Sequence, residues 1–455
     1  MKAWHDECAL FGIWDSDEAS RIAYLGLYAQ QHRGQEASGM VTLNENVQIE
    51  HKGLGLVADV FRESDLDRLK GRAAIGHCRY STAGQNLLAN AQPLTALMMT
   101  GPLAVAHNGN FVNADELRKQ LKETGSIFQG TSDTECLLHL LAKNPSQDLV
   151  KCIKEEAPKV KGAYSLTILT HESLLAVRDP HGFRPLVLGK RKNADGEEAT
   201  VIASETTAFD LIGAKFVREI KPGEIFWVDK SGEHSEFLAE IPKKLSQCVF
   251  EHVYFSRPDS VVFGKSVYES RKQMGVELAK EQPASADMVI AVPDSGIAAA
   301  LGYSQESKIP FDMGIIRNHY IRRTFIEPQQ SIRSLGVKIK LNPQTAILKG
   351  KRIVVVDDSL VRGTTSEKII NLIRLAGAKE VHVRIASPPT TGPCYYGVDT
   401  PQKEQLIAAN QTLEQIRKFI GADTLGYLSV AGMMKGVNSS KQKYCAACFD
   451  GEYPV

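Results

Sequence analysis

The segment from Ile353 to Thr365 constrains the fold of this chain more than any other. It begins with an apolar, β-branched run that stops abruptly at two adjacent carboxylates, Asp357 and Asp358. A small polar loop that contains glycine follows. After Ser366, apolar residues recur at the spacing of one helical face: Ile369, Ile370, Ile373 and Ala376. The pattern therefore predicts a buried strand, then a loop, then an amphipathic helix.

This junction has the chemistry of a sugar-phosphate site. A helix N-terminus presents backbone N–H groups that bind phosphate favourably, and Thr364 and Thr365 add two hydroxyls there. Asp357 and Asp358 at the mouth of the strand suit sugar hydroxyls, or a Mg²⁺ that bridges them. The alternative is a buried strand followed by an ordinary acidic turn, which requires the whole segment to be ordered this way by chance.

The segment resembles the phosphoribosylpyrophosphate (PRPP) signature of type I phosphoribosyltransferases. The resemblance implies that the paired acids contact the ribose hydroxyls and the metal, while the loop through Thr365 cradles the 5-phosphate. PRPP is then expected as a substrate. The PRPP-binding residues implied in this segment are Asp357, Asp358, Ser359, Arg362, Gly363, Thr364 and Thr365.

Length and composition exclude several other classes of protein. The 455 residues fit two domains better than one core, and 43% hydrophobic with 24% charged residues is typical of a soluble globular protein. Lys+Arg 54 against Asp+Glu 53 gives no general attraction to nucleic acid or membranes. We find no apolar run that could span a bilayer and no signal-peptide pattern at Met1–Ala9, and we expect a cytoplasmic protein.

A cysteine close to the chain start opens the first buried strand pattern, Cys8–Trp14. Three polar clusters follow it at expected strand ends: Gly76–Thr82, Ala106–Asn110 and Thr131–Glu135. Taken singly they are weak signals, since His-Asn-Gly is usually a turn and Ser-Asp-Thr-Glu is often a helix N-cap. Their order after a near-terminal cysteine resembles the class II glutamine amidotransferase domain. That family is an N-terminal-nucleophile (Ntn) hydrolase with a four-layer αββα fold.

The resemblance gives Cys8 a specific chemistry. If residues 1–7 are a leader that is removed, Cys8 carries both a thiol and a free α-amine. An α-amine has a pKa near ~7.7–8.0 and takes the thiol proton at neutral pH without a separate histidine. The thiolate then attacks the glutamine carboxamide, which releases ammonia and leaves a thioester for water to hydrolyse. The residue after the nucleophile is Ala9, where the resemblance leads us to expect glycine; this difference bears on processing or local packing.

Other residues of this half receive roles from the same resemblance. Arg79 is expected to hold the glutamine α-carboxylate with its planar fork, and Asp133 to receive the α-ammonium. The side-chain amide of Asn108 and the backbone N–H of Gly109 are expected to form the oxyanion hole. Arg33 also matches a motif of the family, in Gln-His-Arg-Gly-Gln, without an assigned role.

The second half alternates strand and helix patterns after a hinge expected around Leu238–Ser246. A small-residue helix is expected at Ile297–Tyr303, and strands are expected at Met288–Val292, Phe311–Ile316, Ile353–Val356 and Val381–Ile385. This reads as a parallel sheet with crossover helices, whose ligands sit at the carboxyl ends of the strands. The predicted fold class is α/β, with an αββα Ntn domain at residues 8–236 and a phosphoribosyltransferase domain with a parallel sheet at 247–455.

Two further segments complete the expected PRPP site. Pro293–Gly296 ends a strand, and by resemblance Ser295 joins Asp357 and Asp358 around Mg²⁺; an ordinary turn is the alternative. The basic segment from Arg317 continues to Lys340. A solvated loop is the default interpretation, but cations beside a pyrophosphate site also suit a closing lid. The resemblance makes Arg323 and Lys340 phosphate contacts on that lid.

Four late cysteines lack an obvious partner in sequence. They are the Cys-x-x-Cys pair near the chain end and two isolated residues: Cys445, Cys448, Cys394 and Cys248. Spacing alone cannot join them, and a lone Cys-x-x-Cys fits zinc or redox chemistry. Together they resemble the iron–sulfur branch of the amidophosphoribosyltransferases, in which four such thiolates hold a [4Fe–4S] cluster with a structural role. Zinc is the main rival. We interpret Cys78, Cys136 and Cys152 as small buried side chains.

The resemblance to amidophosphoribosyltransferases extends from Cys8 to Cys448. It implies conversion of PRPP, glutamine and water to 5-phosphoribosylamine, glutamate and pyrophosphate, the first step of purine synthesis, by a homotetramer that purine nucleotides inhibit. A PRPP-sensing regulator is one rival, and the intact set from Cys8 to Asp133 argues against it. An amidotransferase that makes amino sugars or asparagine shares the first half only, and the Asp357–Asp358 loop excludes it.

Overall fold

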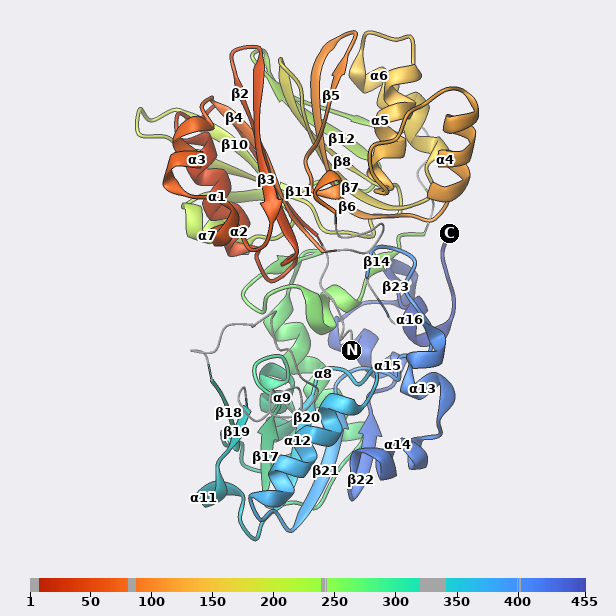
Figure 1. Cartoon of the computed structure of the whole chain (residues 1–455). Helices are drawn as coiled ribbons and strands as arrows, with labels where there is room; N and C mark the ends of the chain where they lie inside the picture. Colours follow the sequence, from red (N-terminus) through yellow and green to blue (C-terminus); the bar gives the residue numbers. More distant parts are fainter. Residues whose placement is uncertain are drawn as a thin grey trace.

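The chain forms two halves that follow each other in sequence and stack in space. The computed structural model describes residues 8–80, 87–238, 242, 244–318, 341–398, 400 and 402–455. Figure 1 shows the N-terminal half, red through yellow-green, above the C-terminal half, green through blue. No helix in these described ranges has the length and apolar character needed to cross a membrane.

Two antiparallel sheets face each other in the N-terminal half (Figure 1). The first has the order β11(Lys215–Glu219), β9(Val187–Lys192), β10(Glu198–Ala203), β1(Ala9–Trp14), β4(Ala73–Arg79), β2(Ala37–Asn44), β3(Val47–Leu54). The second has the order β13(Gly232–Phe237), β12(Glu224–Asp229), β8(Ser173–Arg178), β7(Gly162–Leu169), β6(Gly101–Phe111), β5(Leu94–Met98). Small and branched apolar side chains from both, such as Leu10, Ile75 and Ala104, fill the space between them.

Helices cover the outer faces of both sheets. On the first sheet lie α1(Ala19–Ala29), α2(Val57–Val60), α3(Glu63–Arg68) and α7(Thr207–Ile212). On the second lie α4(Ala114–Glu123), α5(Thr134–Lys143) and α6(Leu149–Glu156). The layers therefore run helix, sheet, sheet, helix, and the predicted αββα architecture is confirmed.

The C-terminal half is built on a parallel sheet of the order β17(Met288–Ala291), β20(Arg352–Asp357), β21(Glu380–Ile385), β22(Thr424–Tyr427). One face packs on α8(Val267–Glu281), α9(Ile297–Ser307) and α15(Val430–Gly436). The other packs on α11(Thr345–Leu348), α12(Thr364–Leu375) and α14(Leu413–Ile420), while α13(Ile407–Asn410) lies nearby. β17 and the middle of β20 are apolar because both faces of the sheet are covered, whereas β21 carries the buried His382 and Arg384.

Most predicted elements of this half are found, with one correction. The predicted strand Phe311–Ile316 is wrong as a member of the parallel sheet: only Phe311 bridges to Val289. Its end forms instead a separate antiparallel ribbon, β18(Ile315–Arg317) with β19(Leu341–Pro343). Asp312 and Gly314 interrupt the apolar run, so no continuous sheet face forms there. Strand β22 joins the sheet without having been predicted.

Short elements form the junction between the halves. After Leu238, which is buried in the core of the first half, β14(Gln247–Cys248) pairs in parallel with β23(Tyr444–Cys445). A π-helix at Glu251–Phe255 follows, then the small ribbon β15(Val261–Val262) and β16(Lys265–Ser266); α16(Ala447–Asp450) lies beside β23. The expected hinge Leu238–Ser246 falls partly outside the described residues.

Candidate functional site

Cys8 lies at the start of β1 in the interior of the N-terminal half. Its side chain is 6% exposed, and its Sγ lies 3.7 Å from the Tyr80 carbonyl oxygen. Burial raises the pKa of the Cys8 thiol to about 11, although the Tyr80 carbonyl contact and the Arg79 charge oppose this. A thiol in this environment is protonated at neutral pH and becomes a nucleophile only with a base beside it.

Arg79 and Asp133 are the charged side chains that act most strongly on Cys8 from the neighbouring elements. Arg79 is the last residue of β4, and Asp133 is the N-cap of α5; both are buried. Burial favours a higher pKa for Asp133, but His107 and the N–H groups of Phe111 and Thr134 lower it below its ordinary value. The structure therefore brings together a buried cation and a buried anion beside the thiol, as expected of a pocket for an amino acid.

Asn108 and Gly109 lie within β6 rather than at its end. Among the residues that the structure describes, neither polar atom of the fully buried Asn108 side-chain amide has a hydrogen-bond partner. A buried amide without partners costs about 1–3 kcal/mol, so this group is available to a ligand. Gly109 has φ +147°, and a Cβ there would lie 2.1 Å from the Ala163 carbonyl oxygen, so only glycine fits.

Behind these residues lies a buried charge network that the sequence did not reveal. The Arg33 guanidinium bonds the carboxylates of Glu205 and Glu251, and Arg184 lies 3.5 Å from Glu251. All four side chains are fully buried. Only one signal pointed to the carboxylates: each is a single acidic residue next to an apolar run.

Asp357 and Asp358 end β20 at the carboxyl edge of the parallel sheet. Asp358 is buried and accepts a 2.5 Å hydrogen bond from the Ser359 hydroxyl, and its own N–H donates to Asp357. Removal from water and the adjoining Asp358 carboxylate raise the pKa of Asp357 well above its ordinary value. These are the conditions that a cation or a pair of sugar hydroxyls would relieve.

The loop after these acids leads directly into α12. Gly363 is the N-cap residue with φ +76°, and α12 begins at Thr364, two residues earlier than predicted. The hydroxyls and N–H groups of Thr364 and Thr365 therefore lie in the first turn. The guanidinium of Arg362 donates to the Gln405 side chain at 2.8 Å, so it is engaged away from the loop centre.

The loop Pro293–Gly296 adjoins the paired acids, since β17 and β20 are neighbours and Val292 N–H donates to the Val356 carbonyl. A Cβ on Gly296 would lie 3.3 Å from the Asp357 Cα, so the two loops touch and Ser295 is adjacent to the acids in the fold. Asp294 of the same loop forms a 2.5 Å ion pair with Arg317. The expected lid contacts Arg323 and Lys340 lie outside the described residues.

The four late cysteines converge on one small apolar cavity between the halves. Its lining includes two side chains of the first half, Phe183 and Arg184, and all four thiols: Cys248, Cys394, Cys445 and Cys448. The thiols are free, and burial raises the pKa of Cys248 to about 11. Across the described ranges no three His, Cys, Asp or Glu side chains form a group for a metal ion. Cys78, Cys136 and Cys152 are buried as predicted.

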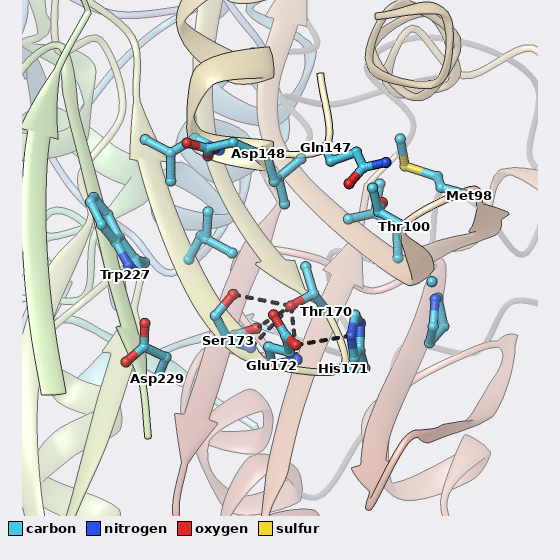
Figure 2. A pocket seen from close by; sticks show the side chains of 16 residues that line it. Met98, Thr100, Gln147, Asp148, Thr170, His171, Glu172, Ser173, Trp227 and Asp229 are labelled. Carbon is cyan, nitrogen blue, oxygen red and sulfur yellow. Dashed lines mark hydrogen bonds and ion pairs between the residues drawn. The ribbon is translucent and has the colours of Figure 1, made fainter. Parts of the chain in front are cut away.

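A further pocket of about 240 Å³ lies at the outer end of the N-terminal half (Figure 2). None of the predicted site residues lines it. Asp148 there already accepts hydrogen bonds from the N–H groups of Val150 and Lys151, and Thr170 bonds Ser173. Its lining holds no cysteine, and we do not place the reaction in it.

Known families match both halves. The family model for a glutamine amidotransferase domain matches residues 77–210, and that for a phosphoribosyl transferase domain matches residues 274–400. Both ranges fall inside the predicted domains.

Full-length relatives agree with this assignment. Amidophosphoribosyltransferase 1 of Arabidopsis thaliana, a chloroplastic protein, is 54% identical over 99% of this chain and 79% of its own. The amidophosphoribosyltransferase of Bacillus subtilis is 46% identical over 100% of this chain and 95% of its own. The solved structure of the B. subtilis glutamine PRPP amidotransferase, complexed with ADP and GMP, matches with a TM-score of 0.92 over 98% of this chain and 97% of that one. This chain therefore belongs to the amidophosphoribosyltransferases, the enzymes that catalyse the first committed step of purine biosynthesis.

Proposed function

We propose that this chain makes 5-phosphoribosylamine, glutamate and pyrophosphate from PRPP, glutamine and water, with the glutaminase step at Cys8 and phosphoribosyl transfer at Asp357 and Asp358. One observation carries the proposal: one half buries a thiol and an amide that has no hydrogen-bond partner among the described residues, and the other places paired acids before a helix N-terminus.

In the proposed glutaminase step, removal of residues 1–7 frees the α-amine of Cys8. That amine takes the thiol proton, which the raised pKa of the buried thiol makes necessary. The sulfur attacks the amide carbon of glutamine, while Arg79 and Asp133 hold the α-carboxylate and α-ammonium. The oxygen that becomes negative is stabilised by the Asn108 amide and the Gly109 N–H. The C–N bond breaks, ammonia leaves with the proton, and water then hydrolyses the thioester to glutamate.

In the proposed transfer step, the first turn of α12 binds the 5-phosphate of PRPP. Backbone N–H groups and the hydroxyls of Thr364 and Thr365 supply the donors, with Ser359, Arg362 and Gly363 shaping the loop. Asp357 and Asp358 accept hydrogen bonds from the ribose hydroxyls. Ammonia forms the new C–N bond at C1 as the C–O bond to pyrophosphate breaks. Arg323 and Lys340 stay predictions as lid contacts on the phosphates.

The residues beside this site fit a magnesium ion. Asp357, Asp358 and Ser295 offer hard oxygen donors at adjoining strand ends, which is what Mg²⁺ prefers. Bound there with PRPP, Mg²⁺ would supply charge neutralisation for the departing pyrophosphate. No residue of the chain is needed to protonate that leaving group.

The thiol-lined cavity fits a structural [4Fe–4S] cluster. Soft thiolates select zinc or iron–sulfur clusters, and the donors Cys248, Cys394, Cys445 and Cys448 contain no histidine or carboxylate. We favour the cluster from the resemblance to the iron–sulfur branch. Iron and acid-labile sulfide with a broad visible absorbance shoulder are expected in protein purified without oxygen. Zinc without iron would overturn this choice.

Ammonia must pass from one centre to the other without protonation, because ammonium is no nucleophile. We propose a closed passage through the junction of the halves, completed when the lid orders over PRPP. A variant with a disrupted lid would then still hydrolyse glutamine but release ammonia to solvent. Tight coupling in such a variant would contradict the passage.

The assay that tests the overall function is glutamate release with and without PRPP, together with 5-phosphoribosylamine formation. We expect release that PRPP stimulates, an intact mass that lacks residues 1–7, and inhibition by purine nucleotides. A PRPP sensor would release no glutamate, and another class II amidotransferase would ignore PRPP. A homotetramer and a cytoplasmic location are predictions that sedimentation and localisation would check.

A further inference from the structure

Arg33 matches a sequence motif of the family, but the proposed reaction gives it no role. Its Nε donates a 3.1 Å hydrogen bond to the backbone carbonyl of Cys8. Its Nη1 and Nη2 make two bonds to the Glu251 carboxylate, of 2.9 Å and 2.8 Å, and Nη1 also bonds Glu205 at 2.5 Å. Arg33 thus ties the backbone of the nucleophile residue to two carboxylates.

These carboxylates come from different halves of the molecule. Glu205 follows β10 in the N-terminal half. Glu251 begins the π-helix that opens the C-terminal half, where the Ser256 hydroxyl donates to it at 2.6 Å. Arg33 itself belongs to the N-terminal half, so the two-bond fork between Arg33 and Glu251 crosses the junction.

The hydrogen-bonded fork between Arg33 and Glu251 is buried, and its burial bears on its function. The side chains of Arg33 and Glu251 are 0% exposed. A buried ion pair is weak evidence for stability, because desolvation offsets most of the attraction, but it fixes two planar groups in one geometry. The Arg33 guanidinium also binds the Cys8 carbonyl. Fixing the guanidinium therefore also fixes the backbone of the residue that reacts.

Contacts continue from Glu251 toward the paired acids. The carbonyl of Ser256, whose hydroxyl holds Glu251, accepts a 2.8 Å hydrogen bond from the buried Arg271. Arg271 is also bound to the His252 carbonyl, and the Asp358 carboxylate acts on it as an opposite charge. Hydrogen bonds therefore run from the Cys8 backbone to Arg271, and Arg271 interacts in turn with the charge of Asp358.

We propose that Glu251 is a positioning residue for the glutaminase step: it holds Arg33, and through Arg33 the backbone of Cys8, in the reactive geometry. The inference rests on the proposed role of Cys8 as nucleophile. It means that the C-terminal half supplies a group that the N-terminal centre requires.

The test compares Glu251→Gln with the wild-type protein in three assays. Glutamine hydrolysis is expected to fall about 10²-fold in kcat, because small misplacements of a nucleophile cost that much, with the KM for glutamine changed by less than about threefold. Alkylation of Cys8 by iodoacetamide is expected to slow. Formation of 5-phosphoribosylamine from added ammonia is expected to stay within about twofold, which shows that the fold and the PRPP site are intact.

Glu224→Gln is the matched control. Glu224 is 1% exposed and also binds an arginine, Arg218, by two bonds, but it has no contact with Arg33 or Cys8 among the described residues. The Glu224→Gln variant is expected to keep the wild-type kcat for glutamine hydrolysis. Unchanged glutamine hydrolysis in Glu251→Gln, or an equal loss in the control, would overturn the proposal.

A double-mutant cycle separates positioning from general loss of stability. If Glu251 acts through Arg33, then Arg33→Gln with Glu251→Gln loses no more kcat than Arg33→Gln alone; additive losses would overturn the proposal. Should Glu251→Gln fail to fold, Glu251→Asp keeps the charge on a shorter side chain, and a wild-type kcat there would overturn it. A wild-type protein that makes no 5-phosphoribosylamine from either nitrogen source would defeat the proposed function itself.

Discussion

The two candidate centres of this molecule are built in opposite ways. The residues of the first centre lie in a strand, directly beside one or at a helix cap, and all are buried: Cys8, Arg79, Asn108 and Asp133. Those of the PRPP site stand on loops at the ends of parallel strands, and several are only half-buried: Asp357, Ser359, Arg362 and Ser295. The first centre is fixed before substrate arrives, while the second still has room to close.

The difference follows from the two reactions. Hydrolysis of an amide needs donors set in advance around a small oxyanion, and preset donors act mainly on kcat. PRPP carries a 5-phosphate and a pyrophosphate group; the whole molecule must enter and be enclosed, and the pyrophosphate must then leave, which requires loops that move. Substitutions in the first centre should therefore lower kcat, and those in the second should also change KM.

Cys8→Ala separates the centres most completely. Glutamine-dependent formation of 5-phosphoribosylamine is expected to vanish, because the thioester forms on the Cys8 sulfur that the substitution removes. Formation from added ammonia should persist, since the PRPP site does not use the thiol. Cys78→Ala, at a neighbouring buried cysteine, is the control and should keep glutamine-dependent activity. Thioester formation that persists in Cys8→Ala would contradict this separation of the two centres.

Asn108→Ala tests the preset character of the first centre. Loss of one oxyanion donor costs about 10²–10³ in kcat, and we expect the KM for glutamine to change far less. The variant should not be much less stable, because within the described part of the chain the amide has no hydrogen-bond partner to lose. Steady-state kinetics and urea unfolding check both statements. A rise in KM without a fall in kcat would contradict the oxyanion role.

Gly363→Ala tests the second centre. Gly363 has φ +76°, which strains an L-residue, and a Cβ would lie 2.9 Å from the end of the Ile407 side chain, so that side chain or the loop before α12 must shift. Strain of about 1 kcal/mol corresponds to a several-fold rise in the KM for PRPP. Glutaminase activity without PRPP should be unchanged. Gly350→Ala, also at positive φ but with open space around it, provides the control.

The dependence of protein stability on acid pH is the smallest effect that we expect to distinguish the two centres. Burial favours a higher pKa for Glu205, but His32 and Arg33 lower it to about 2, against an ordinary 4.5. A lowered pKa means that its stabilisation is present above about pH 4.5 and is lost as pH falls toward 2, on the order of 3 kcal/mol. Glu205→Gln should be less stable at neutral pH and less sensitive to acid.

Asp357 should behave with the opposite sign. Its pKa is raised, so its favourable contribution is present below its ordinary value and is lost as pH rises through the raised pKa. Asp357→Asn should therefore stabilise the ligand-free protein near pH 7. Urea unfolding from pH 3.5 to 7.5 gives the change in unfolding free energy that each substitution causes. If that change varies with pH in the same direction for both variants, the contrast is wrong.

The sequence predicted the elements whose pattern is local. β20 and α12 follow from an unbroken apolar run and a helical period, and both sheets of the first half follow from the resemblance. The failed strand at Phe311–Ile316 shows the limit, since an apolar run does not say which sheet will accept it. Strand β22 contains Thr424 and Gly426, so it lacks the continuous apolar run that marks β17, a strand of the same length.

The residues missed by sequence reasoning act over long separations. Glu251 and Arg33 are distant in the chain, and neither segment alone indicates that a fork of hydrogen bonds joins them. The convergence of Cys248, Cys394 and Cys445 on one cavity likewise came from resemblance, because spacing carries no such information. Chemistry carried by neighbouring residues can be inferred from the sequence. Contacts between side chains across the junction of the halves can be seen only in the folded structure.

The two-residue ladder between β14 and β23 has a consequence for biosynthesis. It joins the first segment of the C-terminal half to a strand near its far end, with the whole parallel sheet in between. On the ribosome, Cys248 emerges long before Cys445, so the half cannot close on itself during most of its translation. The N-terminal half can fold meanwhile, whereas β14 must wait until late in synthesis for β23 to become available.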